Sequence, residues 1–395
     1  MAVTETSSSG PSNFSGGRRE APGWWVFRGT GRPQPEFDIT EELPPPPQWR
    51  TYHGGPLLPP PPPVHEDEET VRVLGVAPEA TQQRRYLGEQ EYERLSKINA
   101  ALYLRRPLLV MGPPGIGKSV LAAQIASELN LGRVLRWTVN SRSTLRSGLY
   151  DYDPISQIHD LNLESIRRGL RADVDQIDES TDEGVAHLSF SAQRIGRYLR
   201  IGPLGTAFLP YRQPRVLLID EFDKGDYDLA GDLLTLLESG RYSIPELYRL
   251  RSVAPKITVQ IDDPQCEATI VEGEIRCSAF PIVVITCNEE RPYPPEFLRR
   301  CIPLRLAPPS REELVEIVAA NFSGGVPAHT DSFIRDFLRR STEEGATLAV
   351  DQLLNAVHLA GAIDPDPDGE SDERAFLEEI TALLWHRLTE TPGAG

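Results

Sequence analysis

A glycine-rich segment near the middle of the N-terminal half has the residue types and spacing that bind a phosphate chain. Its residues are Gly112, Pro113, Pro114, Gly115, Ile116, Gly117, Lys118, Ser119 and Val120. Glycines let backbone N–H groups close around phosphate oxygens, the lysine reaches the β- and γ-phosphates, and the hydroxyl binds Mg²⁺. We therefore predict a triphosphate site here, with Lys118 on the phosphates and Ser119 on the metal ion.

Two carboxylates and an amide follow apolar runs further along the chain. Asp220 and Glu221 follow residues 216–219, and Asn288 follows residues 281–287. The carboxyl ends of strands form the ligand-binding edge of an open α/β sheet, and hydrolysis needs a carboxylate on Mg²⁺ and a group that orients water. We predict Asp220 for the metal ion, Glu221 for the water and Asn288 for the γ-phosphate or water. A solvent-facing acidic strand end and a turn-forming Asn are the alternatives.

Two adjacent arginines, Arg299 and Arg300, follow a short segment that is predicted to be helical, residues 294–298. An arginine that reaches across a subunit boundary would stabilise transition-state charge on the neighbouring phosphate. A solvated surface pair is the alternative. The order of elements along the chain favours the catalytic role.

The elements around these residues indicate an α/β fold. Residues 107–111 predict a strand before the glycine-rich loop, and Leu121, Ile125 and Leu129 predict a helix after it. The apolar run 216–219 is typical of a strand buried on both faces of a parallel sheet. We therefore expect a parallel sheet that is flanked by helices.

A hairpin and a helical region complete the predicted fold. Residues 257–271 alternate as two strands, which predicts a β-hairpin before the next core strand. Ser310 and Glu313 form a capping box that opens a helix to about residue 322. Apolar stripes at helical spacing follow, so residues 309–391 are expected to form a small all-helical domain.

Residues 1–80 have a different composition from the rest of the chain. They hold Ser/Gly-rich sequence, two proline runs at 44–47 and 59–63, and the acidic patch 66–69. This composition predicts a disordered or extended N-terminal arm. The alternative is that its aromatic residues dock on a neighbouring surface: Trp24, Trp25, Phe27, Phe37 and Trp49.

Composition excludes several other classes. The net charge of −17 opposes broad nucleic-acid binding, because proteins that track phosphates need a basic surface. No apolar run approaches the ~20 residues of a membrane helix. The four cysteines form no C-x-x-C pair, and the polar N-terminus lacks the apolar core of a signal peptide. We expect reduced thiols and a cytoplasmic protein.

The chain resembles the AAA+ ATPases, and most closely the MoxR-like ATPases, over roughly residues 81–391. Residues 112–119 look like Walker A, 217–221 like Walker B, Asn288 like sensor 1, and Arg299 with Arg300 like the arginine-finger segment. The runs 218–224 and 233–240 are especially similar to MoxR-type members.

This resemblance implies a P-loop AAA+ nucleotide-binding domain at residues 81–308 and a helical lid at 309–391. It implies ATP and Mg²⁺ as cofactors, ATP hydrolysis, and a homo-oligomeric ring, commonly a hexamer, with ATP at subunit boundaries. MoxR-like proteins remodel a partner protein or insert a metal into it, often beside von Willebrand factor A-domain proteins, and some relatives act in bacterial conflict systems.

Two segments are compared with the family pattern residue by residue. The lid near residues 349–351 lacks the arginine that the family often uses as sensor 2. Residues 140–153 match the place of a central pore loop, with Leu149 or Tyr150 as contact residues. A loop that packs on its own domain is the alternative.

Three functions compete at this point. The first is an ATP-hydrolysing ring that remodels a protein client. The second is an ATP-binding oligomeric switch with little turnover, which the missing lid arginine permits. The third is a nucleic-acid motor, supported only by scattered arginines and opposed by the acidic balance: Arg194, Arg197, Arg200 and Arg212.

Overall fold

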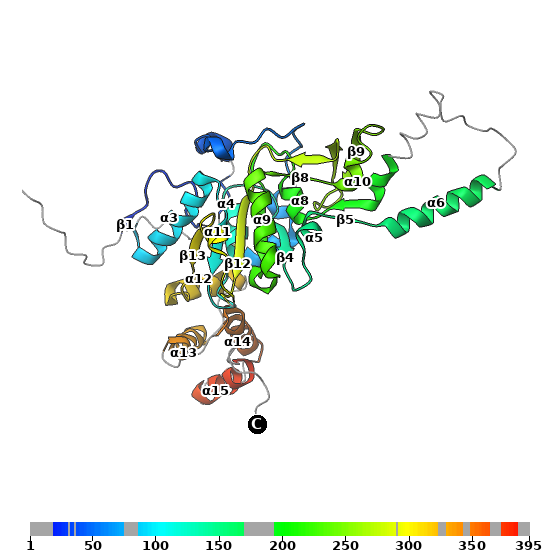
Figure 1. Ribbon diagram of the computed structural model, residues 1–395. Helices are drawn as coiled ribbons and strands as arrows, with labels where there is room; N and C mark the ends of the chain where they lie inside the picture. The colour runs from blue at the N-terminus through cyan, green and yellow to red at the C-terminus, as the bar shows by residue number, and fades with distance from the viewer. Residues whose placement is uncertain are drawn as a thin grey trace, which may run out of the picture.

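The computed structural model describes residues 19–30, 32–34, 37–74, 86–169, 193–289, 291–322, 329–342, 348–363 and 373–385. Within these residues the chain forms an N-terminal arm, an α/β domain with two sheets, and a helical lid domain at residues 311–385 (Figure 1). No helix in this part of the chain is both long and apolar enough to cross a bilayer. All four cysteines are free thiols.

The central sheet has five strands in the order β13-β3-β12-β7-β4, and all neighbours pair in parallel. These strands are β3 (Leu108–Met111), β4 (Leu135–Thr138), β7 (Val216–Asp220), β12 (Ile282–Cys287) and β13 (Ile302–Arg305). Ile285 of β12 lies opposite both Leu109 and Ile219. Strand β12 therefore lies between the strand that leads into the glycine-rich loop and the strand that ends in the carboxylates. The predicted parallel sheet is confirmed.

Helices cover both faces of this sheet, because alternate strand residues point to opposite sides. Helices α3 (Glu89–Leu104) and α4 (Val120–Glu128) pack with Val216 and Leu218 on one face. Helix α9 (Tyr227–Ser239) packs with Leu217 and Ile219 on the other. As predicted, α9 ends at Gly240, whose left-handed backbone has φ of 61°.

A second sheet of six strands lies beside the first, in the order β5-β6-β9-β10-β11-β8. The strands are β5 (Tyr150–Tyr152), β6 (Leu199–Ile201), β8 (Arg241–Ser243), β9 (Lys256–Gln260), β10 (Glu267–Val271) and β11 (Glu274–Arg276). The predicted hairpin is confirmed, since β9 and β10 pair antiparallel, but it forms part of this larger sheet. Helix α6 (Pro154–Gly169) extends away from the body of the domain (Figure 1).

Short helical segments connect the strands of the two sheets. They are α5 (Leu145–Leu149), η3 (Arg194–Tyr198), α8 (Pro203–Ala207), η4 (Phe222–Lys224), α10 (Pro245–Tyr248) and α11 (Pro295–Leu298).

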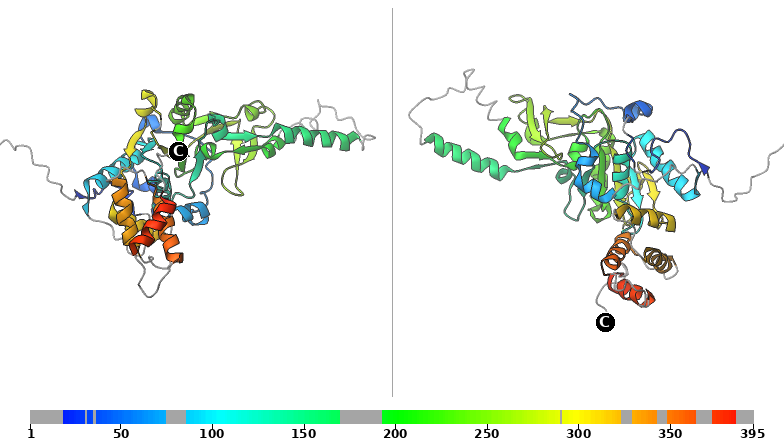
Figure 2. Two further views of the ribbon diagram at one scale, coloured as in Figure 1. Left: turned by 90° about the horizontal axis from the view of Figure 1, so that it is seen from below. Right: turned by 180° about the vertical axis from the view of Figure 1, so that it is seen from behind.

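The lid domain contains the helices α12 (Arg311–Asn321), α13 (Thr330–Thr342), α14 (Val350–Ile363) and α15 (Glu373–Leu384). Its buried residues form a core separate from those of the sheets, and Figure 2 shows its helices grouped together below the α/β domain. The predicted capping box is present, because the side chains of Ser310 and Glu313 each accept a hydrogen bond from the other's backbone N–H.

The described part of the arm is extended and packed, so the expectation of disorder differs from the structure at residues 19–74. Its elements are β1 (Arg19–Glu20), α1 (Ile39–Glu42), η1 (Gln48–Arg50), η2 (Val64–Glu66) and α2 (Glu68–Leu74), and β1 pairs antiparallel with β2 (Tyr86–Leu87). Trp25 and Phe27 are buried in the cluster formed by α3 and α4, as the docking alternative requires. Trp49 does not dock and is 79% exposed. Residues 1–18 lie outside the described residues.

Beyond Trp25 and Phe27, the arm continues around the α/β domain. The Arg50 guanidinium donates to the carbonyl of Leu237 at the end of α9. Further on, the Leu58 N–H donates to Pro210 O (3.0 Å), and the Arg133 N–H donates to Pro62 O (3.1 Å). Proline has no N–H to pair and favours an extended backbone, so a proline-rich segment can lie along a surface by donating few bonds and accepting others.

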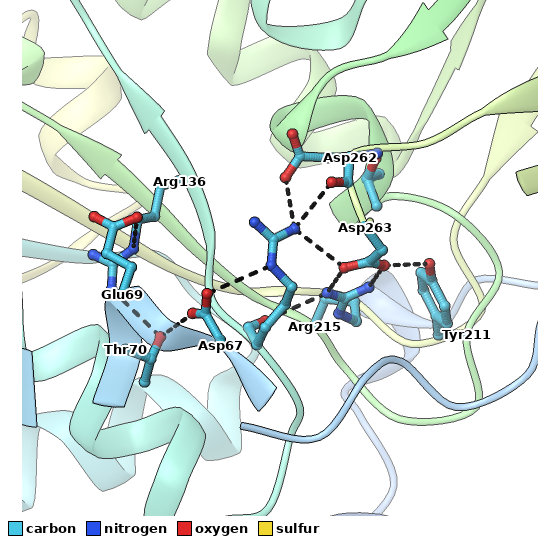
Figure 3. Close-up of polar contacts among 10 residues, drawn as sticks. Asp67, Glu69, Thr70, Arg136, Tyr211, Arg215, Asp262 and Asp263 are labelled. Carbon is cyan, nitrogen blue, oxygen red and sulfur yellow. Dashed lines mark hydrogen bonds and ion pairs between the residues drawn. The ribbon is translucent and has the colours of Figure 1, made fainter. Parts of the chain in front are cut away.

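The acidic patch of the arm pairs with the base of the central sheet (Figure 3). Asp67 lies 4.0 Å from Arg133 and Glu69 lies 3.4 Å from Arg136. Arg133 also contacts Asp263, which accepts two hydrogen bonds from the buried Arg215. This network was not predicted from the sequence, because the two partners in each of these contacts are separated by 48 or more positions.

Candidate nucleotide-binding site

The glycine-rich loop lies between β3 and α4 with the geometry that a phosphate site requires. Gly112, Gly115 and Gly117 have φ of 150°, 75° and 84°, a region that side chains with a Cβ rarely adopt. A Cβ at Gly115 would lie 2.1 Å from the Cβ of Ala349 in the lid domain. The Val350 N–H also donates to Gly115 O (3.0 Å). The loop is therefore contacted directly by the start of α14.

Lys118 is held by acceptors around the loop. Its Nζ donates to Gly112 O (2.8 Å), Pro113 O (2.8 Å) and Asn288 Oδ1 (2.7 Å). Burial lowers the pKa of Lys118 below its ordinary value of 10.5, and neighbouring acidic groups oppose this shift. An ammonium group has three donors, so a phosphate that binds Lys118 must replace one of these acceptors.

Ser119 and Asp220 meet at the carboxyl end of the sheet. Ser119 Oγ donates to Asp220 Oδ1 (2.9 Å), and Thr286 Oγ1 donates to the same carboxylate oxygen. In the described chain, no group of three or more His, Cys, Asp or Glu side chains surrounds a metal site. Mg²⁺ is usually bound by one or two carboxylates together with phosphates and water. A hydroxyl beside a single carboxylate therefore fits a magnesium–nucleotide complex.

Glu221 directly follows Asp220, but its carboxylate has a different partner. Its backbone is left-handed, with φ of 56°, and its N–H donates to Thr286 Oγ1 (3.0 Å). A non-glycine residue in this conformation costs on the order of 1–3 kcal/mol, and such strain clusters at functional sites. The carboxylate forms an ion pair with Lys224 at 2.8 Å, in which both side chains are partly exposed. Asp220 and Glu221 can therefore serve different partners.

Asn288 lies between the loop and the carboxylates. Its side-chain oxygen accepts from Lys118, and its backbone N–H donates to Asp223 Oδ2 (2.7 Å). Asp223 is buried and belongs to η4, directly after Glu221 and Phe222. The turn after β12 is thus hydrogen-bonded to the turn after β7. This contact holds the Asn288 amide beside Lys118 of the glycine-rich loop.

These groups line one end of a large cavity. The cavity has a volume of about 1420 Å³ and is bounded by the loop, the strand ends, the lid domain, α3 and the arm. Seven of the nine predicted loop residues line it: Pro114, Gly115, Ile116, Gly117, Lys118, Ser119 and Val120. Asp220, Glu221 and Asn288 line it as well, whereas Gly112 and Pro113 do not line it and contact Lys118 through their carbonyls.

Arg299 and Arg300 do not line this cavity. They follow α11, and the two arginines differ in their surroundings. Arg300 forms an ion pair with Glu238 at the end of α9, whereas Arg299 is exposed and its carbonyl accepts from Arg106. Neither arginine reaches the phosphate site of its own chain.

The two proposed pore-loop contacts are buried in their own domain. Leu149 and Tyr150 are 7% and 5% exposed and belong to the core around the second sheet. The Tyr150 hydroxyl donates to Glu246 Oε2 (3.0 Å). The alternative of a segment that packs on its own domain therefore describes these residues.

Thr286, Asp223 and the arm segment at the cavity are functional-site residues that were not predicted from the sequence. Thr286 is one position before the end of β12, and its place at the sheet edge could have been inferred from the parallel register. The role of Asp223 could not have been inferred in this way, because residue spacing does not reveal the tight turn that brings it to Asn288. Among the described lid residues that line the cavity, which include Ala349, Val350 and Asp351, none is an arginine.

Comparison with known proteins supports the same reading of this segment. Residues 107–301 match the model of an AAA domain of the dynein-related subfamily. None of the curated proteins matches the chain. Among solved structures, the chain is similar to the FIGL-1 AAA domain in complex with ADP, at 15% identity over 73% of this chain and 74% of that chain. The TM-score of 0.31 is too low for this likeness to add to the fold assignment.

Proposed function

Because residues 107–301 form an AAA domain, we propose that the chain binds ATP with Mg²⁺ and hydrolyses it to ADP and phosphate. The observation that carries this proposal is the convergence of Lys118, Ser119, Asp220, Glu221 and Asn288 on one end of a single cavity. These residues come from three separate parts of the chain, and P-loop hydrolysis needs each of their functional groups.

The proposed roles follow from the contacts. Lys118 exchanges its carbonyl acceptors for the β- and γ-phosphate oxygens, and Asn288, already hydrogen-bonded to Lys118, faces the γ-phosphate. Ser119 and Asp220 would hold Mg²⁺, which neutralises charge on the phosphates when it is bound. Glu221 orients the attacking water and accepts its proton once the carboxylate is released from Lys224.

We further propose that the chain acts in a ring, in which one subunit supplies an arginine to the next. The two arginines are far enough from their own cavity to be absent from its lining, which supports action in trans. Arg299 is the better candidate of the two, because Arg300 is already paired with Glu238. A finger arginine contributes about 10³–10⁵-fold to hydrolysis.

Mixing two inactive variants tests the ring. Arg299→Ala retains its own Glu221, and Glu221→Gln retains its own Arg299, so a mixed ring contains some complete interfaces. We expect each variant alone to be inactive and the mixture to regain ATP hydrolysis. Full activity of Arg299→Ala alone would remove Arg299 from the mechanism. Two inactive variants that regain no activity on mixing would contradict its action across the subunit boundary. Arg300→Ala is the matched comparison.

The work that hydrolysis performs is proposed from motif resemblance. The runs 218–224 and 233–240 support a MoxR-like ATPase that remodels or activates a partner protein in the cytoplasm. A von Willebrand factor A-domain protein is the proposed partner. Capture of such a partner by the Glu221→Gln variant in the presence of ATP would support this assignment.

An ATP-dependent switch with little turnover is the second candidate. Ala349, Val350 and Asp351 occupy the cavity wall where the family often has an arginine. Without that arginine the lid domain lacks a positive charge at the γ-phosphate. Tight ATP binding and ATP-dependent assembly with negligible hydrolysis would favour the switch.

Hydrolysis itself is tested with two substitutions and one control. Glu221→Gln should lower phosphate release by about 10²–10⁴-fold, as for removal of a general base, and leave ADP binding intact. Lys118→Ala should abolish binding of both nucleotides, measured by titration calorimetry. Glu296→Gln, at an exposed glutamate outside the cavity, should behave as wild type. Equal rates in wild type and Glu221→Gln would refute the proposed mechanism.

A further inference from the structure

The arm forms one wall of the cavity that contains the glycine-rich loop. One group of its lining residues lies within positions 64–74. A second group lies within positions 20–33 and includes Ala21, Pro22, Trp25, Arg28 and Thr30. This segment precedes the AAA domain by more than 70 positions, and it reaches the cavity because it packs along α3 and α4.

Two buried polar side chains hold this segment through its backbone, and the first is Asn99 of α3. Its Oδ1 accepts from the N–H groups of Val26 (2.9 Å) and Phe27 (3.0 Å). Its Nδ2 donates to Phe27 O (2.7 Å) and to Leu95 O (2.9 Å). Asn99 has no exposed surface, so its amide satisfies the arm backbone in the way that a neighbouring strand would.

The second is Glu128, the last residue of α4. Its two carboxylate oxygens accept from the N–H groups of Arg28 (2.5 Å) and Thr30 (2.7 Å), and its backbone O accepts from Gln34 N–H (3.2 Å). Glu128 is fully buried. Helix α4 begins at the glycine-rich loop, so the helix that presents the phosphate site at one end holds the arm at the other.

The arm lies at the end of the cavity where a nucleobase would fit. The triphosphate end is fixed by the loop, Asp220 and Asn288, so the base must lie away from it. The lining there includes the apolar side chains of Trp25, Leu87 and Ile317. The cavity, at about 1420 Å³, is larger than the ~300–1,000 Å³ that small-molecule sites usually have, and the arm is one of several walls that bound it.

We propose, on the basis of the ATP-binding function above, that residues 20–33 are a docked wall of the nucleotide pocket and that docking of the arm and nucleotide binding are thermodynamically coupled. Asn99 and Glu128 are then positioning residues for nucleotide affinity, although neither belongs to the phosphate site. The docked arm supplies apolar contacts to the base, and the bound nucleotide stabilises the docked arm.

The coupling follows from linkage. If only the docked form presents the complete pocket, the apparent Kd equals the intrinsic Kd divided by the docked fraction. By reciprocity, the nucleotide must strengthen docking by the same factor. One feature opposes docking: Trp25 Nε1 is buried without an acceptor among the described residues, which destabilises the docked arm in the absence of ligand.

The test uses the full-length chain, ADP with Mg²⁺ and titration calorimetry. Asn99→Leu keeps the side-chain volume and removes the contacts to Val26 and Phe27. Glu128→Gln weakens the contacts to Arg28 and Thr30. Each variant should raise the Kd for ADP by about tenfold, the value expected if about a tenth of the molecules remain docked. Tyr52→Phe, which removes a bond from the arm to Glu238 O outside the cavity, is the matched control with unchanged Kd.

Hydrogen exchange on the wild-type chain gives a test that needs no variant. ADP should slow exchange at the N–H groups of Val26, Phe27, Arg28 and Thr30 more than at Gly54 and Leu58, which anchor the remote part of the arm. In each variant, the factor by which ADP strengthens docking, measured from exchange at this wall, should equal the factor by which docking strengthens ADP binding.

The outcomes separate this inference from the proposed function. If ADP binds wild type and not Lys118→Ala, while both arm variants bind as wild type, the coupling is refuted and the ATP-binding function stands. If wild type binds no ADP, both are refuted. If Asn99→Leu does not fold, Glu128→Gln and the exchange experiment decide, and equal slowing at all six N–H groups overturns the coupling.

Discussion

The two ends of strand β7 carry charged residues in opposite situations. Arg215 precedes the strand, and both it and its partner Asp263 have side chains that are 1% exposed. Asp220 and Glu221 end the strand, and the Glu221 side chain is 40% exposed beside Lys224. Figure 3 shows the first end, where Asp263 lies against Arg215 and Tyr211.

The difference shows how one strand serves stability at one end and chemistry at the other. The two terminal nitrogens of Arg215 donate to the two oxygens of Asp263 at 2.6 and 2.9 Å, so neither charge is available to a ligand. At the other end, Asp220 is contacted by hydroxyl groups, which can exchange with a metal ion or water. Buried charges need complete internal pairing, whereas a functional carboxylate needs a partner that it can leave.

The largest expected effect comes from breaking the buried end. Asp263→Ala leaves the Arg215 guanidinium buried without its carboxylate and should destabilise the fold by about 3–5 kcal/mol. Urea unfolding would measure this as a fall in the midpoint. ADP affinity of the folded protein should be unchanged, in contrast to Lys118→Ala.

A double substitution is the control for this prediction. Arg215→Met with Asp263→Leu replaces the pair by apolar side chains and should recover most of the lost stability. An unfolding midpoint of Asp263→Ala equal to that of wild type would show that the pair contributes little. A loss of ADP affinity in the folded variant would show that the two ends are coupled.

Acid pH should distinguish the two ends by a smaller effect. Burial favours the neutral carboxyl of Asp263, but hydrogen bonds and charge from Arg215 and Arg133 lower its pKa below 3.8. The stability from this group is therefore complete above the unfolded pKa and is lost as pH falls through the lowered folded pKa. Wild type should lose stability more steeply than Asp263→Asn below pH 3.8, measured by urea unfolding across pH. Parallel curves would contradict this expectation.

The smallest effect is expected at the exposed ion pair. Lys224→Ala should change stability by about 0.2–1 kcal/mol, because both side chains of the pair are largely solvated. Because Glu221 is then released from Lys224, the rate of ATP hydrolysis should rise by no more than about fivefold, the factor that corresponds to about 1 kcal/mol. Lys224→Arg, which keeps the charge, is the control. If Lys224→Ala destabilised the fold as much as Asp263→Ala, solvent exposure would not explain the difference between the two ion pairs.

Much of the site and the core could be predicted because the signals are local. The glycine-rich loop is nine consecutive residues, Asp220 and Glu221 directly follow four apolar residues of β7, and Asn288 directly follows the mostly apolar β12. Parallel sheets bring such ends to one edge, so residues 170 positions apart, such as Lys118 and Asn288, could be expected to meet. The subsidiary six-stranded sheet was recognised only as its central hairpin, because its other strands are three residues long.

The docking of the arm could not be predicted from its own composition. Prolines and acidic residues predict an exposed segment when no partner is known. The partners are single polar residues inside other elements, Asn99 in α3 and Glu128 in α4, which look like ordinary helix positions in the sequence. The same holds for Arg215 and Asp263, because a lone arginine before a strand gives no indication of its acceptor.

The path of the arm also sets an order of events during synthesis. Val26 can form its hydrogen bond only after Asn99 has been synthesised, 73 positions later. Arg50 can form its own only after Leu237, 187 positions later. These arm residues are therefore synthesised well before the partners that complete their native contacts, and a helix or hairpin formed early would obstruct docking. The proline runs oppose such premature structure, so the arm stays extended until the domain that it packs against has been synthesised.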